Sequence, residues 1–144
     1  MKLSKNFTLK EMIVSNTAKK YGIDNTPSDD VLYNIKNLVE YVLQPIRDKY
    51  GKPIVINSGY RCLALNNKVG GSKTSQHLTG AAADIEDKSG NNKELFYLIK
   101  KMIENGEIEV GQLIWEYGTK ENPNWVHVSL PKKNKKNQIL YYYS

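Results

Sequence analysis

The sequence predicts an α+β fold in which helices pack on a small antiparallel sheet. Helix-type spacing of apolar residues dominates the first fifty residues, and short strand-like runs dominate the second half. No internal repeat or interdomain linker interrupts the chain, and its 144 residues can bury about two thirds of the surface that the unfolded form exposes. We therefore expect a single domain over residues 1–144, with a core over about 6–131 and a basic tail over 132–144.

Three helices are predicted from apolar spacing and from residues that favour helix ends. Thr8 and Glu11 have the spacing of a capping box and should open a short helix that Gly22 ends. Apolar residues then recur every three or four positions over 28–50, where a serine and two acids precede the pattern and a glycine follows it. A third amphipathic helix is predicted over 91–105.

Strands are predicted after the long helix, from short runs rich in apolar and β-branched residues. The runs cover residues 54–57, 82–85, 112–117, 125–130 and 139–143. Between the last two lies a lysine- and asparagine-rich patch over 132–137, which we expect to form a solvated turn or tail because like charges repel one another.

Charge and composition exclude several classes of function. Four lysines between 132 and 136 carry four of the six net positive charges, so residues 1–130 have a charge of only +2. Without a basic stripe over the body, we expect no nucleic-acid partner. No apolar run approaches the roughly 18 residues of a membrane span, and the first residues lack the apolar stretch of a signal peptide. We expect synthesis in the cytoplasm without a signal peptide.

The chain has the residues for a metal site built without cysteine. Cys62 is the only cysteine, so neither an intramolecular disulfide nor a cysteine-based zinc finger can form. His77 and Asp84 would lie about 10 Å apart on one helix, too far to share an ion, but a turn at Gly80 would let them converge. His127 lies in an alternating run that points it to one face of a strand. Two imidazoles and one carboxylate leave a fourth zinc position open for catalysis.

These residues carry a family resemblance. The pattern S-x-H-x-x-G-x-A-x-D is present from Ser75 to Asp84, and W-x-H is present from Trp125 to His127. In both motifs the chain resembles the zinc D-Ala-D-Ala carboxypeptidases and related phage endolysin peptidases of the peptidase M15 type, over about residues 6–131. The resemblance implies a single zinc peptidase domain of the hedgehog and DD-peptidase type. It also implies one Zn²⁺ per chain, held by His77, Asp84 and His127, and cleavage of peptidoglycan stem peptides.

The resemblance further implies roles for residues around the metal. Arg61, which follows the Ser58-Gly59-Tyr60 turn, takes the place of the family's electrophilic arginine and should pair with a substrate carbonyl or carboxylate. The expected substrate contacts are Ser75, Gln76, Trp125 and Ser129.

The sequence departs from the family at the general base. Well-known members have Glu or Asp three residues before the last zinc histidine, where this chain has Asn124, and an amide is not a useful base. We expect Glu116, on a strand that a short loop pairs with the His127 strand, to take this role. Glu86 and Asp87 are the reserve candidates.

Several alternatives stay open at this stage. A non-catalytic zinc-containing module of the same fold, with a cell-wall-binding or structural role, is the competing function. Within the enzyme hypothesis, a D-Ala-D-Ala carboxypeptidase and an L-Ala-D-Glu endopeptidase are both compatible with the motifs. An endolysin that reaches the cell wall by phage-type release is expected, with a cytoplasmic bacterial enzyme or an exported virion component as alternatives. The oligomeric state is not predicted.

Overall fold

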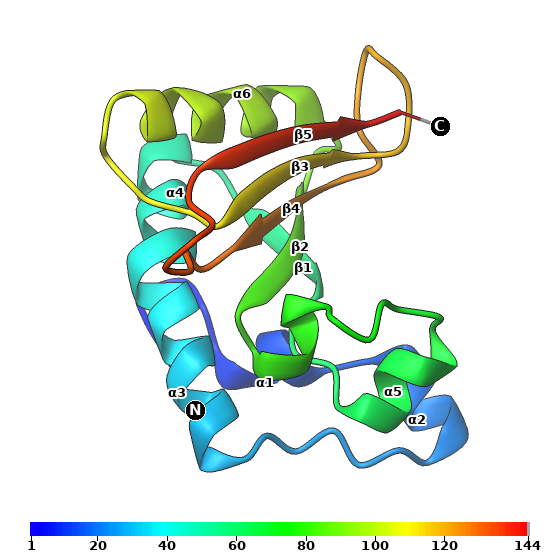
Figure 1. Ribbon diagram of the computed structural model, residues 1–144. Helices are drawn as coiled ribbons and strands as arrows, with labels where there is room; N and C mark the ends of the chain where they lie inside the picture. Colours follow the sequence, from blue (N-terminus) through cyan, green and yellow to red (C-terminus); the bar gives the residue numbers. More distant parts are fainter. Residues whose placement is uncertain (144) are drawn as a thin grey trace.

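The computed structural model describes residues 1–143, and its centre is a five-stranded sheet (Figure 1). The strands lie in the order β1-β2-β4-β3-β5. Their bounds are β1 (Ile54–Ser58), β2 (Ala82–Asp87), β3 (Gln112–Glu116), β4 (Trp125–Ser129) and β5 (Gln138–Tyr142). With the helices described below, this sheet confirms the predicted α+β class.

The prediction of a wholly antiparallel sheet is wrong at β5. The pairs β1–β2, β2–β4 and β3–β4 are antiparallel, but β5 runs parallel to β3. After β4 the chain reverses, and the place beside β4 is already taken by β3. The last strand therefore adds outside β3, and two strands that both oppose β4 in direction must be parallel to each other. Part of the predicted tail is thus built into the sheet.

Short helices precede the long one. The predicted capping box is confirmed, because Thr8 Oγ1 accepts the Glu11 N–H at 3.3 Å and Glu11 Oε1 accepts the Thr8 N–H at 2.9 Å. The segment divides into two helices, α1 (Leu9–Ile13) and α2 (Asn16–Tyr21), because Ser15 caps a new helix. Gly22 ends the second one in a left-handed conformation, as predicted.

The predicted helix over 28–50 is one continuous rod, capped by Ser28 and ended by Gly51. It consists of α3 (Asp29–Leu38), a π-helical segment (Val39–Leu43) and α4 (Gln44–Tyr50). The π segment ends two residues before Pro45, which has no N–H to continue the usual hydrogen-bond ladder.

Three further helices complete the described part of the chain. The helix α6 (Asn92–Glu104) matches the predicted third helix. The helix α5 (Leu63–Lys68) and the 3₁₀ segment η2 (Gln76–Thr79) were not predicted, because six and four residues are too short to show a helical period. No helix within residues 1–143 has the length and apolar character needed to cross a membrane.

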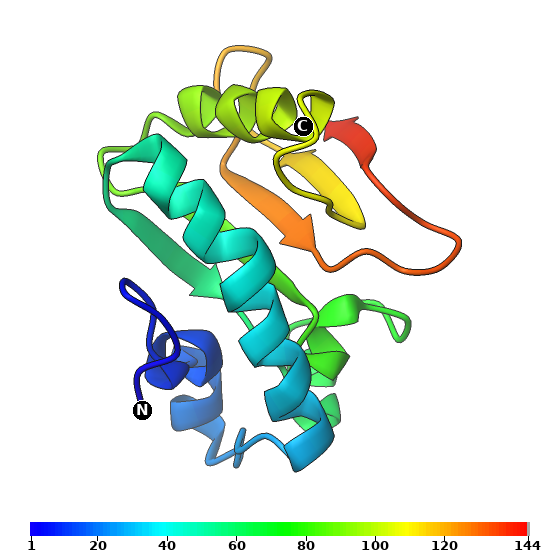
Figure 2. The ribbon, with the colours of Figure 1, turned by 90° about the vertical axis from the view of Figure 1, so that its left-hand side faces the viewer.

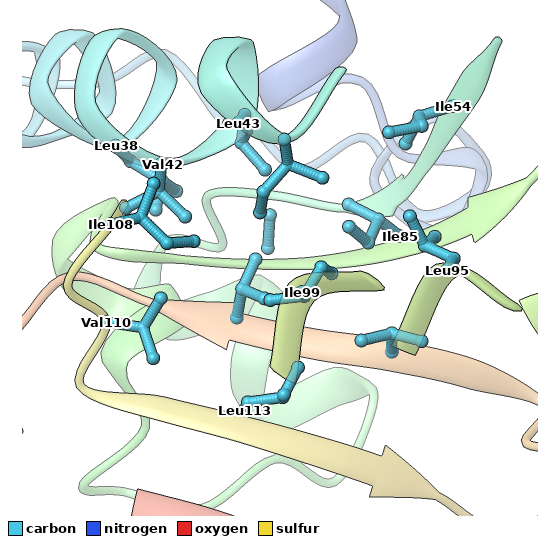
Figure 3. Close-up of a cluster of buried hydrophobic side chains, with 14 of the residues drawn as sticks. Leu38, Val42, Leu43, Ile54, Ile85, Leu95, Ile99, Ile108, Val110 and Leu113 are labelled. Carbon is cyan, nitrogen blue, oxygen red and sulfur yellow. The ribbon is translucent and has the colours of Figure 1, made fainter. Parts of the chain in front are cut away.

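The core lies between one face of the sheet and the helices α3, α4 and α6. Leu38, Val42 and Leu43 of the long helix meet Leu95 and Ile99 of α6 over the sheet (Figure 3). Alternate strand residues point into this core, including Ala83, Ile85, Leu113, Trp115, Val126 and Val128. Their neighbours in sequence therefore face the opposite side of the sheet, where the polar residues of the motifs lie.

Candidate metal centre

The two histidines and the aspartate of the motifs meet on the sheet face opposite the core. One ligand atom from each of His77, Asp84 and His127 lies within 4.8 Å of the others. Asp84 Oδ1 is 3.0 Å from His127 Nδ1, and Asp84 Oδ2 is 3.4 Å from His77 Nε2. The three residues are 3, 9 and 8% exposed, respectively. The sequence therefore brings together residues 77, 84 and 127 as predicted.

Sheet register and one turn create this convergence. Asp84 of β2 lies directly opposite His127 of β4, so the two side chains share one face. His77 comes from η2, where the Ser75 hydroxyl accepts the His77 N–H at 3.1 Å and which ends at Gly80 with a φ of 77°. A Cβ at Gly80 would press against Ile35 of α3, so only glycine suits both the turn and the close approach.

The orientation of His77 fits a metal ligand. Its Nδ1 lies 2.7 Å from the carbonyl oxygen of Gly59, which can only accept, so Nδ1 carries the proton. The lone pair of Nε2 then faces Asp84 Oδ2, which is also an acceptor. Two acceptors that face each other in a buried site need a cation between them. A backbone carbonyl behind the imidazole is also a usual support for a metal-binding histidine.

The charge state of Asp84 fits the same role. Burial raises the pKa of this carboxyl, but the adjacent imidazoles of His127 and His77, which in their protonated forms would donate to it, outweigh burial and hold the pKa below its ordinary value. Asp84 is therefore ionised at neutral pH. A carboxylate with two imidazoles suits Zn²⁺ and leaves its fourth position open.

The three candidate ligands line a cavity of about 710 Å³, a size suited to a small ligand or short peptide. The other predicted site residues that line it are Arg61, Ser75, Gln76, Glu116 and Trp125. Residues that were not predicted line it as well, among them Gln112, Ile114, Tyr117, Lys132, Lys135 and Tyr142.

Comparison with known proteins agrees with this arrangement. The family model described as Peptidase M15 matches residues 5–129, which include all three candidate ligands. The chain belongs to the Peptidase M15 family. A zinc D-Ala-D-Ala carboxypeptidase from Streptomyces albus G is 46% identical over 44 residues, which are 30% of this chain and 17% of that protein. The similarity thus covers well under two thirds of the length of that relative.

Glu116 lies at the end of β3 in this member of the Peptidase M15 family, on the same sheet face as the candidate ligands. It pairs with Trp125 of β4, while Ile114 pairs with His127, so Glu116 is a diagonal neighbour of His127 at about 7–8 Å between backbone positions. Burial raises the pKa of Glu116, and the charge of Asp84 raises it further, while the two histidines oppose these effects. A partly buried carboxylate with a raised pKa has the properties of a general base.

The other carboxylates considered for this role lie elsewhere. Asp87 faces the other side of the sheet, where its Oδ2 accepts the Asn91 N–H at 2.9 Å. Glu86 accepts hydrogen bonds from Asn57 and Asn92 outside the cavity lining. Asn124 is exposed, and only its backbone N–H reaches Glu116, at the carbonyl oxygen. Among these candidates, the M15 fold brings only Glu116 to the metal centre.

Arg61 has unused hydrogen-bonding capacity beside the candidate ligands. Its backbone N–H donates to the His77 carbonyl at 3.0 Å, which ties the arginine loop to η2. Its Nε is buried and has no hydrogen-bond partner within residues 1–143, and Nη1 makes only a long contact of 3.4 Å with Ser58 Oγ. Burial lowers the pKa of Arg61, opposed by the charge of Asp84, yet a guanidinium stays protonated in proteins.

The predicted substrate contacts divide into two groups. Ser75, Gln76 and Trp125 line the cavity and are partly buried. Ser129 is fully buried, and its hydroxyl accepts the Gln112 N–H at 2.9 Å inside the sheet. The prediction for Ser129 is therefore corrected, because period-two alternation gives the face of a residue but not its accessibility.

Among the residues that were not predicted, some carried a usable signal. Gln112 and Ile114 share a strand face with Glu116, so alternation alone could have placed them at the site. For Lys132 and Lys135 the signal was the lysine patch directly after the W-x-H strand, which was interpreted only as a solvated segment.

Proposed function

We propose that this M15 peptidase hydrolyses peptide bonds in the stem peptides of peptidoglycan, with one Zn²⁺ held by His77, Asp84 and His127. The observation that carries the proposal is the buried His-Asp-His group, in which Gly59 orients His77 with its Nε2 lone pair toward the ionised Asp84. Family membership and the named activity of the Streptomyces albus G relative support the same chemistry.

The proposed mechanism is metal-assisted hydrolysis. Zinc in such a site supplies Lewis-acid chemistry, because it acidifies water and polarises a carbonyl group. Glu116 accepts the proton of the attacking water and returns it to the leaving amine. Arg61 donates hydrogen bonds from its unpaired N–H groups to the oxygen on which negative charge develops. Ser75, Gln76 and Trp125 contact and orient the peptide.

Digestion of purified peptidoglycan, with the products identified by mass spectrometry, tests this proposal. Wild-type protein loaded with zinc should release peptide fragments or free amino acids, and a sample treated with a chelator should release none. The same products distinguish loss of D-Ala from cleavage between L-Ala and D-Glu. Lysis of cells by the added protein would support an endolysin-like role at the cell wall. Unchanged peptidoglycan in the presence of bound zinc would contradict the peptidase proposal.

The second candidate is a zinc-containing module of the same fold that binds the cell wall or has a structural role without catalysis. It is favoured by one observation, namely that an exposed amide, Asn124, stands where well-known relatives of this type have their base. Zinc binding and sedimentation with peptidoglycan, combined with no product from any stem peptide, would support it.

A further inference from the structure

The turn between β4 and β5 brings two lysines to the cavity of the metal centre. Lys132 and Lys135 are exposed and line this cavity, and the backbone closes the turn with hydrogen bonds of 3.0 and 3.1 Å between these two residues. Figure 2 shows the turn projecting on the same side of the sheet as the loop before β2, away from the long helix. The segment expected to be a solvated turn or tail is an exposed turn, and it also forms part of the wall of the candidate site.

Backbone pairing places the two positive charges side by side. Lys132 and Lys135 form an antiparallel bridge, and residues directly opposite one another in such a bridge point to the same face. Like charges in this arrangement repel each other. Within residues 1–143 neither amine has an acidic partner within 4.0 Å, whereas the neighbouring Lys136 pairs with Glu109 at 3.6 Å. An anion between the two amines would remove this repulsion.

The other charged groups of the cavity lie apart from this lysine pair. Asp84 faces the two histidines, and Glu116 lies at the far end of β3 beside Trp125. Arg61 lies next to the His77 segment and is partly buried, so it is distinct from the exposed lysine pair. The cavity thus has one cation near the candidate ligands and two more on the β4–β5 turn.

We propose that Lys132 and Lys135 bind a carboxylate of the peptide substrate and select anionic peptides for the metal centre. This inference rests on the proposed function, because it assigns a substrate class to the same cavity. The carboxylate can be the C-terminal one or that of an acidic residue within the stem peptide, since both offer the same two oxygens to the amines. A terminal carboxylate would make the site a carboxypeptidase, whereas an internal one is compatible with an endopeptidase.

The test measures binding rather than turnover, with the zinc-loaded Glu116→Gln protein as the parent so that peptides stay intact. Calorimetry compares diacetyl-L-Lys-D-Ala-D-Ala as free acid and as C-terminal amide. A second pair compares acetyl-L-Ala-D-Glu amide with its D-Gln counterpart. Each peptide is measured with the parent, with Lys132→Gln/Lys135→Gln, and with the control Lys133→Gln/Lys136→Gln. The control removes the same charge from the same turn but from residues outside the cavity lining.

The Lys132→Gln/Lys135→Gln substitutions should weaken binding of one carboxylate peptide by about three- to tenfold and leave the affinity for its neutral counterpart unchanged. The control substitutions Lys133→Gln/Lys136→Gln should change the affinity for the same peptide less than about twofold. The preference for the acid should also shrink between 0.1 and 1 M salt, as the screening length falls from about 10 to about 3 Å. The peptide pair that responds identifies the source of the carboxylate.

Three results would overturn the inference. The two double variants could change affinity equally, or the cavity variant could lose equal affinity for the acid and the neutral peptide. The third is that the parent binds neither acid peptide. These results are distinguishable from failure of the proposed function. Lysine-dependent binding without hydrolysis by wild-type protein would refute the peptidase and retain the carboxylate site. Hydrolysis by wild-type protein, combined with peptide affinities that do not change when Lys132 and Lys135 are replaced, would support the peptidase and refute the carboxylate site.

Discussion

Asp84 and His127 face each other across the neighbouring strands β2 and β4, with 3.0 Å between Asp84 Oδ1 and His127 Nδ1. The other carboxylate oxygen faces His77 Nε2, so each oxygen of Asp84 contacts one imidazole. Two of the three proposed ligands are thus fixed by sheet register, and the third is fixed by η2 and the Gly59 carbonyl.

Replacing His127 by Ala should release the metal, because two protein ligands rarely hold Zn²⁺ against buffer. Elemental analysis of dialysed wild-type and variant protein measures the effect, with circular dichroism to show that the variant is folded. About one zinc per chain is expected for the wild type and almost none for the variant. Full zinc content in the folded variant would place the metal elsewhere.

Replacing Glu116 by Gln should leave zinc bound and reduce hydrolysis of peptidoglycan at least about 100-fold, because the proposed base is lost. Glu121→Gln is the matched control, since that glutamate is exposed and lies outside the cavity lining. Initial rates at equal zinc content compare the three proteins. A Glu116→Gln protein as active as wild type would remove Glu116 from the mechanism.

The same substitution should stabilise the zinc-free protein at neutral pH. Burial raises the pKa of Glu116, so the folded state disfavours its charge, and this cost is fully present above the folded pKa. It disappears as pH falls below the ordinary glutamate pKa of about 4.3. Thermal melts should show a gain of roughly 2–4 °C for Glu116→Gln at pH 7. The gain should be much smaller near pH 4, and a gain that does not depend on pH would argue against this origin.

Changing Arg61 to Lys should keep zinc bound and lower the hydrolysis rate at least about tenfold. Lysine retains the charge but lacks the planar fork, whose buried Nε–H is unpaired within residues 1–143. Steady-state rates on the peptide that peptidoglycan digestion identifies measure the loss. Arg61 would be only a structural residue if the Lys variant turned over that peptide at the wild-type rate.

Replacing Gly59 by Ala should weaken zinc binding through His77. An alanine Cβ would collide with the Met12 carbonyl, so the backbone must shift and move the Gly59 oxygen away from His77 Nδ1. A competition assay with a chelator measures zinc affinity, which we expect to fall about 10-fold or more. The control is Gly111→Ala, whose Cβ would collide with the Leu130 carbonyl, an acceptor for Gln76, and not with the Met12 carbonyl next to Gly59. Equal loss of zinc affinity in both variants would indicate a general loss of stability instead.

The convergence of the three candidate ligands was largely predictable from the sequence, because it depends on local geometry. Alternation along the 125–130 run gave the face of His127, and Gly80 gave the turn that separates His77 from the Asp84 strand. The same reasoning placed Glu116 on the face that it occupies. Each of these predictions needs only the period of a strand or the conformation of one residue.

The remaining features depend on contacts between distant parts of the chain. The Gly59 carbonyl behind His77, the burial of Ser129 and the parallel pairing of β5 all follow from how separate elements stack. A one-dimensional pattern shows none of these. The predicted solvated turn over 132–137 is confirmed, but its place in the wall of the cavity cannot be read from the sequence, because it depends on β3 and β5 being neighbours.

The connection that skips over β3 has a consequence for how related chains can diverge. Residues between β4 and β5 are held at one end by the strand of His127 and at the other by pairing along β3. Insertions, deletions or changes of charge in this short connection can therefore reshape the wall of the cavity while the proposed ligands Asp84 and His127 stay in register. The β4–β5 connection is therefore a suitable place to engineer a new specificity without moving the candidate ligands.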